Sequence, residues 1–435
     1  MIFQYGILLF ERKVVILKAD IVSLLYCREI LLALHNMYMP VLLIVICLVF
    51  CIMDLMAEGY RNIQRQLFNI CFIVIVVLCT CKYAYGADVK HYYSFYEELT
   101  DSYAMNVANG LTNFEPGFMW FCTMCKLIGL SYWWMTVIVS LFYWGAIYWL
   151  FSNIKYHRMF ALLVIVVLDN ALFLEQLRQC IAVALIIYAF CFYHRYSWKI
   201  IPVLLLVAST SMHKTALPFV FFLLLGLVFS GLEIDKKAYF MLAVLLFSFM
   251  IFSLHPLLQR FLLFLPSSLQ DSAGYHLMVG KRFQKVFILY FMAILCMGYY
   301  TRPINADKRE RVYHWMIWSC IGVIVVLYQY YLILYRIRSY MLPFIIVWVM
   351  NTFAAKADKE QLLKQMTCLV ILLFSLSLVI ELPHRYKNMH GQIYRTSWVW
   401  ELRKHPEKDI LARQMEQATL FWEYDNNKGL QLGFK

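Results

Sequence analysis

The stretch DNALFLEQLRQCIAVALIIYAF, residues 169–190, places Glu175 and Arg178 at the edge of an apolar run. A membrane-spanning helix needs roughly 20 mostly apolar residues, and the run that starts near Arg178 meets that requirement. Charged side chains at membrane depth cost roughly 2.5–3.5 kcal/mol on insertion scales, so they are usually present for a function. The stretch therefore predicts a membrane helix that begins with Arg178 at the rim of the bilayer.

The rest of the chain has the same apolar character. Of its 435 residues, 63% are hydrophobic and only 15% are charged, a balance typical of membrane proteins. About a dozen segments between residues 37 and 383 meet or approach the length of a span. We expect an all-α polytopic membrane protein with about 12 transmembrane helices. Residues 1–36 are an N-terminal extension that is amphipathic or precedes the true start at Met37, and residues 384–435 form a basic, aromatic tail.

The distribution of lysine and arginine predicts how the chain is oriented. The formal charge of +13 comes largely from short basic loops between apolar runs, and such loops are retained in the cytoplasm. The charge thus reports orientation and not a nucleic-acid partner. Segments 159–194, 200–235 and 312–355 each fit one helical hairpin whose midpoint lies outside, and residues 83–130 form an outer segment. Residues 115–130 are too short to span comfortably and are expected to form an interfacial or re-entrant helix. Composition favours a cytoplasmic tail, whereas the parity of twelve spans places the tail outside.

Candidate anion-binding residues gather at the outer ends of these hairpins. The guanidinium of Arg178 at a helix N-terminus adds its donors to unpaired backbone N–H groups, a combination suited to phosphate, and Gln179 follows it. An isolated rim arginine can also be an anchor whose charged end reaches into water. Arg336 and Arg338 lie near the turn expected in LYRIRSYMLP. Because they are two residues apart, only one of them need face the site.

Three outer residues could accept a proton. His213 has an ordinary pKa near neutrality, Asp88 follows a glycine turn, and Glu115 is held extended by the proline after it. We rank His213 and Asp88 ahead of Glu115; each could instead be a solvated rim residue. Tyr92, Tyr93 and Trp120 offer flat faces for sugars, although aromatic residues at this depth also form the ordinary interfacial belt.

The motifs that are missing also limit the chemistry. The sequence has no phosphate-binding glycine loop, no dinucleotide fingerprint, no H-E-x-x-H and no D-x-D pair. Cys122 and Cys125 have redox spacing but no companion ligands, so we interpret them as structural. We expect no metal and no cofactor.

Four motifs in order, YGADVKHYYSFY, EPGF, LEQLRQCIAVAL and SMHKTALPF, resemble the EpsG/Wzy-type polysaccharide polymerases of bacterial exopolysaccharide and O-antigen synthesis. The resemblance covers about residues 38–350. It departs from the family pattern in the extended N-terminus, in the basic tail, and in HKTA, where Thr215 stands in place of the more usual serine. It implies an architecture like that of C-type membrane glycosyltransferases (GT-C) and polyprenyl-diphosphate-linked oligosaccharide substrates.

This resemblance predicts a metal-independent glycosyltransferase of the bacterial cytoplasmic membrane, with a site formed by extracytoplasmic loops. Repeat units on undecaprenyl diphosphate would be joined at the outer face, with membrane lipid and a chain-length regulator as candidate partners. A lipid-linked oligosaccharide flippase is an alternative, but its polar residues should run through the depth of the bundle. An O-antigen ligase or acyltransferase of the same pathway is a second alternative, which the sequence separates poorly from a polymerase.

Overall fold

The computed structural model describes residues 38–57, 60–83, 88–111, 114–154, 158–196, 200–229 and 331–356, together with 397, 398 and 412. The N-terminal extension, the basic loops after residue 230 and most of the tail lie outside the described residues, and so does the predicted total of twelve spans. Within the described part the chain is almost entirely helical, in agreement with the expected all-α class.

Three described helices are long and apolar enough to cross a membrane: α4 (Arg61–Thr80), α8 (Tyr132–Phe151) and α11 (Leu177–Tyr196). α4 ends just before, and α8 begins just after, the outer segment that the sequence predicted at residues 83–130. The other apolar helices are α3 (Tyr38–Met56), α9 (Arg158–Leu168), α12 (Ile200–Met212), α13 (Ala216–Phe229) and α19 (Tyr331–Lys356). Several long apolar helices in one chain suggest a multi-pass membrane protein.

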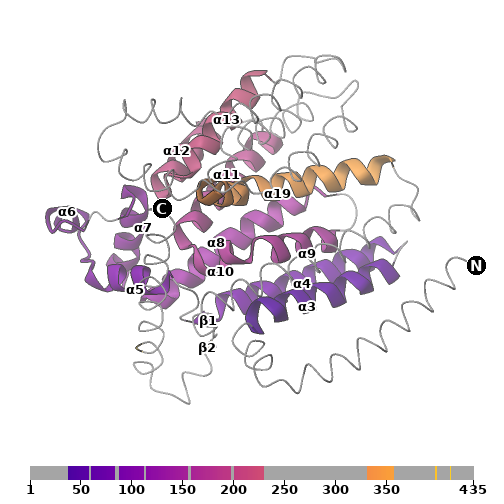
Figure 1. Ribbon diagram of the computed structural model, residues 1–435, viewed down its shortest axis with the longest axis horizontal. Helices are drawn as coiled ribbons and strands as arrows, with labels where there is room; N and C mark the ends of the chain where they lie inside the picture. The colour runs from indigo at the N-terminus through magenta and orange to yellow at the C-terminus, as the bar shows by residue number, and fades with distance from the viewer. Residues whose placement is uncertain are drawn as a thin grey trace, which may run out of the picture.

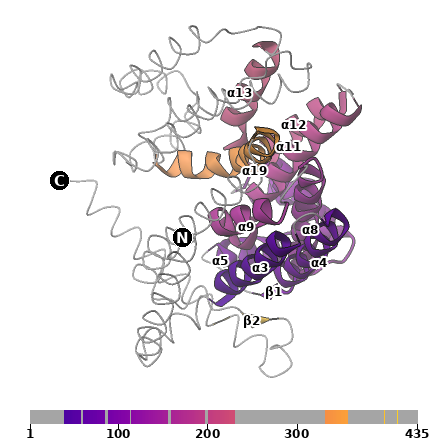
Figure 2. The same ribbon diagram turned by 90° about the vertical axis from the view of Figure 1, so that its right-hand side faces the viewer.

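The helices pack around α11 (Figure 1). This helix lies between α8 and α12, and its apolar residues from Ile181 to Ile187 are all buried. On one side of the bundle, α3 packs against α4 and α9, while α19 contacts α9 and α13 (Figure 2). Outward-facing residues of α4 and α12, such as Ile73 and Val207, stay exposed. Exposed apolar faces of this kind fit a lipid environment.

The first predicted hairpin contains an extra break. Between α9 and α11 the chain forms the short helix α10 (Asn170–Glu175), and Asp169 separates α9 from α10. The Asp169 carboxylate accepts a hydrogen bond of 2.6 Å from Ser339 on α19, which holds the break against the neighbouring helix. Arg178 is the second residue of α11, so the prediction that it begins a helix is confirmed.

The prediction of a turn around Arg336 and Arg338 is wrong. The structure instead has the continuous helix α19 from Tyr331 to Lys356, with Pro343 inside it. A proline interrupts the hydrogen bonds of a helix without ending it when neighbouring helices cover the freed groups, and α19 is packed against α8, α9, α11 and α13. Both arginines therefore lie on one helix.

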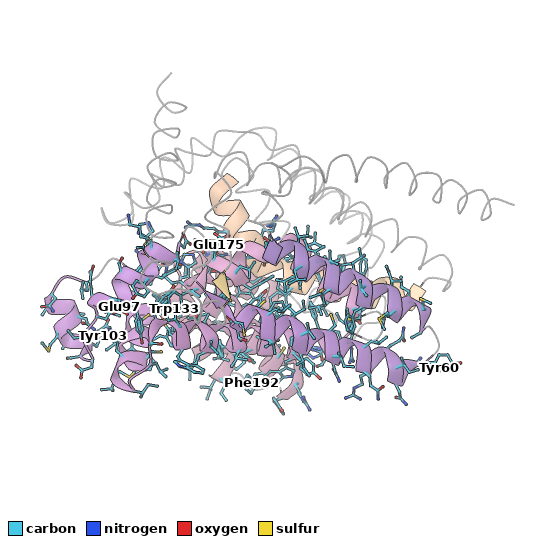
Figure 3. All side chains as sticks on the ribbon, turned by 90° about the horizontal axis from the view of Figure 1, so that it is seen from below. Tyr60, Glu97, Tyr103, Trp133, Glu175 and Phe192 are labelled. Carbon is cyan, nitrogen blue, oxygen red and sulfur yellow. The ribbon has the colours of Figure 1, made fainter. Side chains whose placement is uncertain are left out.

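The outer segment forms three short helices, α5 (Val89–Glu98), α6 (Tyr103–Ala108) and α7 (Pro116–Leu127). At 12 residues, α7 is too short to span a bilayer, as the sequence indicated. Glu97 and Tyr103 lie at one end of the described helices and Tyr60, just before α4, lies at the other (Figure 3). After α4, strand β1 (Lys82–Tyr83) pairs antiparallel with β2 (Ser397–Trp398).

Candidate functional site

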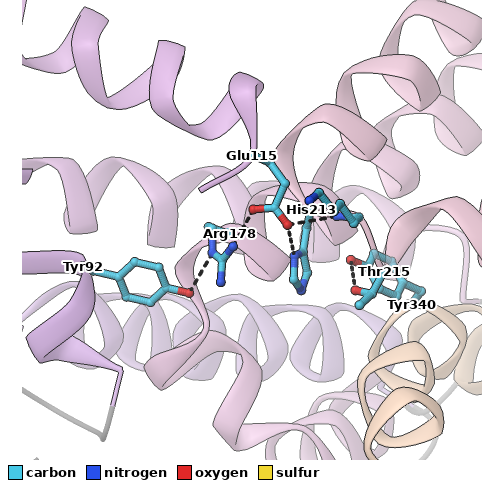
Figure 4. Close-up of polar contacts among 7 residues, drawn as sticks. Tyr92, Glu115, Arg178, His213, Thr215 and Tyr340 are labelled. Atoms are coloured by element: carbon cyan, nitrogen blue, oxygen red, sulfur yellow. Dashed lines mark hydrogen bonds and ion pairs between the residues drawn. The ribbon is translucent and has the colours of Figure 1, made fainter. Parts of the chain in front are cut away.

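Three of the predicted residues come together from three different elements (Figure 4). Glu115 is the N-cap of α7, Arg178 begins α11, and His213 lies between α12 and α13. The proline after Glu115 disfavours helical backbone, and Glu115 accordingly adopts an extended conformation with φ −61° and ψ 144°. Glu115 therefore lies outside the helical backbone of α7, directly before its first residue.

Glu115 joins the other two residues. Its Oε2 accepts a hydrogen bond from Nη1 of Arg178 in an ion pair, and its Oε1 lies 3.0 Å from Nδ1 of His213. The backbone N–H of Lys214 also donates to Oε1, at 3.2 Å. Both carboxylate oxygens are thus occupied, and the Glu115 side chain is only 6% exposed. One carboxylate holds the arginine and the histidine at a fixed separation.

The guanidinium of Arg178 is fixed by aromatic groups as well. Its Nε donates a hydrogen bond of 3.4 Å to the hydroxyl of Tyr92, and the ring of Phe114 lies 4.4 Å from its central carbon. A ring face attracts a cation, and a planar guanidinium stacks well on it. The side chain of Arg178 remains 21% exposed, so the cation is partly open to a ligand.

The surroundings determine the charge states of Glu115 and His213. Burial alone would raise the pKa of Glu115, but the hydrogen bond from His213 and the charge of Arg178 hold the pKa well below its usual range. Burial lowers the pKa of His213, and the nearby Glu115 offsets this only in part. At neutral pH we therefore expect an ionised Glu115 and a neutral His213.

These charge states define the tautomer of the histidine. An ionised carboxylate can only accept hydrogen bonds, so the proton of the neutral imidazole lies on Nδ1 and is donated to Glu115. The lone pair of Nε2 is then available to accept a proton from another group. Glu115, by contrast, is a poor proton acceptor because its pKa is held low.

Asp88 and Arg336 contribute charge to the same region. Asp88 immediately precedes α5, and burial raises its pKa while the charges of Arg336 and Arg178 lower it in part. Arg336 also acts electrostatically on His213. Farther along α19, the hydroxyl of Tyr340 lies 3.2 Å from Oγ1 of Thr215, the threonine of the HKTA motif. The region therefore combines two cations with two carboxylates and a histidine.

Four predicted residues have other environments. Gln179 is buried and donates to the carbonyl of Arg336, which joins α11 to α19. Arg338 donates to the carbonyl of Leu168 at the end of α9, at 2.7 Å, where a cation compensates unpaired carbonyl groups. The remaining two are aromatic: Tyr93 is stacked on Trp133, and Trp120 is 53% exposed on α7.

Some residues that shape the site were not expected from the sequence. Gly117 is one: a Cβ added there would lie 2.9 Å from Cβ of Ser211 on α12, so only glycine allows α7 and α12 to pack this closely. A glycine inside a helix costs about 1 kcal/mol relative to alanine, and that cost was a signal that the sequence offered. Phe114 and Tyr340 gave no comparable signal.

Cys122 and Cys125 are both buried on α7, and Sγ of Cys122 lies 3.6 Å from Sδ of Met135. These surroundings agree with a packing role. Among the described residues no group of three or more His, Cys, Asp or Glu side chains is placed to hold a metal ion. The expectation of metal-independent chemistry stays a prediction.

Comparison with known proteins gives one match. The family model described as "EpsG family" matches residues 65–395, about three quarters of the chain. No curated protein and no solved structure matches the chain. The matched range includes Asp88, Glu115, Arg178, His213 and Arg336. The chain therefore belongs to the EpsG family, which is associated with exopolysaccharide biosynthesis.

Proposed function

We propose that this chain is a polysaccharide polymerase. It joins oligosaccharide repeat units carried on undecaprenyl diphosphate, at the outer face of the bacterial cytoplasmic membrane. The observation that carries the proposal is the pairing of a fixed, partly exposed arginine with a neutral histidine through Glu115. Such a pair offers a cation for a leaving group and an acceptor for a proton within one site.

In the proposed reaction a hydroxyl of the acceptor sugar attacks the anomeric carbon of the donor glycan. The new glycosidic C–O bond forms while the bond from that carbon to the lipid diphosphate breaks, and the diphosphate leaves with the electron pair. Arg178 stabilises the negative charge that develops on the leaving group, and Arg336 adds to the local positive potential. The hydroxyl proton passes to Nε2 of His213, with Asp88 as the second candidate base.

The test is deletion of the gene, followed by gel analysis of surface glycan and of carrier-linked glycan. Loss of a polymerase stops elongation but leaves single repeat units that are still exported and transferred, so we expect one-unit glycans and no long polymer. A cell without surface sugar would instead indicate a flippase. Long chains retained on the polyprenyl carrier would indicate a ligase, and either result would refute the proposal.

A further inference from the structure

Arg178 already binds an anion supplied by the protein itself. The carboxylate of Glu115 occupies Nη1 of the guanidinium, the group to which the proposed function assigns a lipid diphosphate. Figure 4 shows Glu115 between Arg178 and His213, with Tyr92 on the opposite side of the arginine. A carboxylate and a phosphate use the same planar donors of arginine, so the two anions compete for one site.

While Glu115 stays bound, only some of the five N–H donors of Arg178 are left for a diphosphate. Nε donates to Tyr92 and Nη1 to Glu115, whereas Nη2 has no hydrogen-bond partner among the described residues. A phosphate can bind at the two N–H groups of Nη2. A phosphate that binds both terminal nitrogens shares Nη1 with the Glu115 carboxylate, and repulsion between the two adjacent anions favours release of Glu115.

Release of Glu115 changes the charge balance at His213. Among the residues that the structure describes, the charged groups that act on His213 are Glu115 from the start of α7, Arg178 from α11 and Arg336 from α19. While Glu115 is paired with Arg178, its negative charge is largely compensated. Once Arg178 pairs with a diphosphate, the carboxylate acts on His213 alone and favours protonation of the imidazole, which makes Nε2 a stronger base.

We infer that Glu115 is a positioning residue that competes with the lipid diphosphate for Arg178 and, once displaced, activates His213 as the base. Donor binding and base formation are coupled through a single carboxylate. This inference rests on the proposed function. In the absence of donor, Glu115 compensates the charge of Arg178. Proton transfer to His213 becomes efficient only after the donor has bound.

The experiment uses the full-length protein in lipid nanodiscs and measures the binding of farnesyl diphosphate, a short soluble probe of the polyprenyl diphosphate class. We expect Glu115→Gln to bind the probe about 5- to 100-fold more tightly than the wild type, the range typical of coupled sites. The same variant should lower kcat of polymer formation about 10-fold or more, because His213 loses the carboxylate that activates it. Tighter binding with slower turnover is a combination that mere structural damage does not produce.

Two further variants define the comparison. Glu98→Gln makes the same change at an exposed carboxylate on α5 and should leave binding and turnover at wild-type values. Arg178→Gln should abolish binding of the probe. If Glu115→Gln does not yield a folded sample, Glu115→Asp carries the test: it keeps the charge on a shorter side chain, which weakens contact with Arg178, and should bind the probe with intermediate affinity.

Unchanged or weaker binding in Glu115→Gln, or no binding of the probe to any form, overturns the inference. Tighter binding in that variant supports it. The proposed function fails separately, through the glycan pattern of the deletion strain, and tighter binding in Glu115→Gln would still support a diphosphate site with an internal competitor in that case.

Discussion

At the scale of single residues, Arg178 depends on the shape of its side chain as much as on its charge. Tyr92, Phe114 and Glu115 each contact a different part of the guanidinium. Lysine would keep the positive charge but would present a single ammonium group without a planar face or a fixed pair of donors. The contacts of Arg178 therefore favour arginine specifically at this position.

We expect Arg178→Lys to be nearly as damaging as Arg178→Ala. Each lost charge-assisted hydrogen bond is worth roughly 1.5–3 kcal/mol, so kcat/KM for polymer formation should fall about 10- to 150-fold. The measurement is the rate of chain elongation by membranes carrying each variant. Arg195→Lys, the same change at an exposed position in the last turn of α11, is the matched control. Full activity of Arg178→Lys would reduce Arg178 to a general positive charge.

The pH dependence of the reaction reports the state of His213. The neutral imidazole is the active form of a base, so activity is present above its pKa and is lost as the pH falls through it. Because burial lowers the pKa of His213, the acid limb of kcat/KM, which reports the free enzyme, should lie below pH 6.5. His213→Gln should lose most of the activity, whereas Asp88→Asn should still show the fall in kcat/KM at acid pH. Loss of the limb in Asp88→Asn would identify Asp88 as the base.

Local sequence rules could predict where each site residue lies on its own segment, but not which residues meet. Arg178 at a helix start and Glu115 in extended backbone follow from their immediate neighbours. Glu115, however, is 63 residues from Arg178 and 98 from His213, and these contacts depend on how α7 packs onto α12 and α12 onto α11. The low rank given to Glu115 reflected this: without its two partners, Glu115 is only one more carboxylate at the membrane rim.

At the scale of elements, the position of α7 on α12 determines the geometry of the site. Glu115 begins α7 and His213 follows α12, and Gly117 contacts Ser211 between them. Any separation of the two helices moves the carboxylate away from the imidazole. The helix α7, which is too short to cross the membrane, thus determines where Glu115 meets the other charged groups.

Gly117→Ala should separate α7 from α12. Its Cβ would lie 2.9 Å from both Cβ and the backbone carbon of Ser211, and the backbone cannot yield easily. We expect a loss of about 1–3 kcal/mol in stability, as for other overpacked sites, and a fall in elongation rate of about 10-fold or more. Thermal unfolding in nanodiscs and the elongation assay measure the two effects.

The control is Gly145→Ala on α8, where the added Cβ would meet the hydroxyl of Tyr188 at 2.8 Å. That hydroxyl is the far end of a side chain and can move, so the cost should be smaller and the elongation rate should stay near the wild-type value. Equal losses of activity in both variants would mean that Gly117 matters for general packing and not for the position of Glu115.

The length of apolar runs and the positions of prolines predicted those helices whose bounds do not depend on neighbouring helices. The spans at α4 and α8 and the short α7 follow from composition. The broken path from α9 to α11 and the continuous α19 could not be predicted in the same way. A proline or a pair of arginines ends a helix in one environment and is accommodated in another, and here the helices around α19 cover the groups freed at Pro343.

At the scale of the whole molecule, Glu97 and Tyr103 of the outer segment and Tyr60 before α4 lie at opposite ends of the described helices (Figure 3). The positive-inside rule places the basic end of α4 in the cytoplasm. We expect single cysteines introduced at Asp101 and Lys214, both exposed, to react with an impermeant maleimide in intact cells. Cysteines at Arg61 and Arg195, also exposed, should react only after the membrane is opened.

The described native cysteines are mostly buried, so their reaction with the reagent should be slow, and the unmodified chain measures that background. Labelling of the Arg61 position in intact cells, with protection of the Lys214 position, would reverse the orientation of the bundle. Such a reversal would place the site on the cytoplasmic side and would remove the basis for an outer-face polymerase.

The pairing of β1 with β2 ties two distant parts of the chain to one side of the membrane. Lys82 and Tyr83 come directly after α4, and they hydrogen-bond to Ser397 and Trp398 near the end of the chain. A polypeptide that returns to the side it left has crossed the bilayer an even number of times. If α3 and α4 are the first two of the twelve predicted spans, ten follow, and that number satisfies the condition. A reporter enzyme inserted directly after Trp398 should therefore sample the same compartment as residue 82.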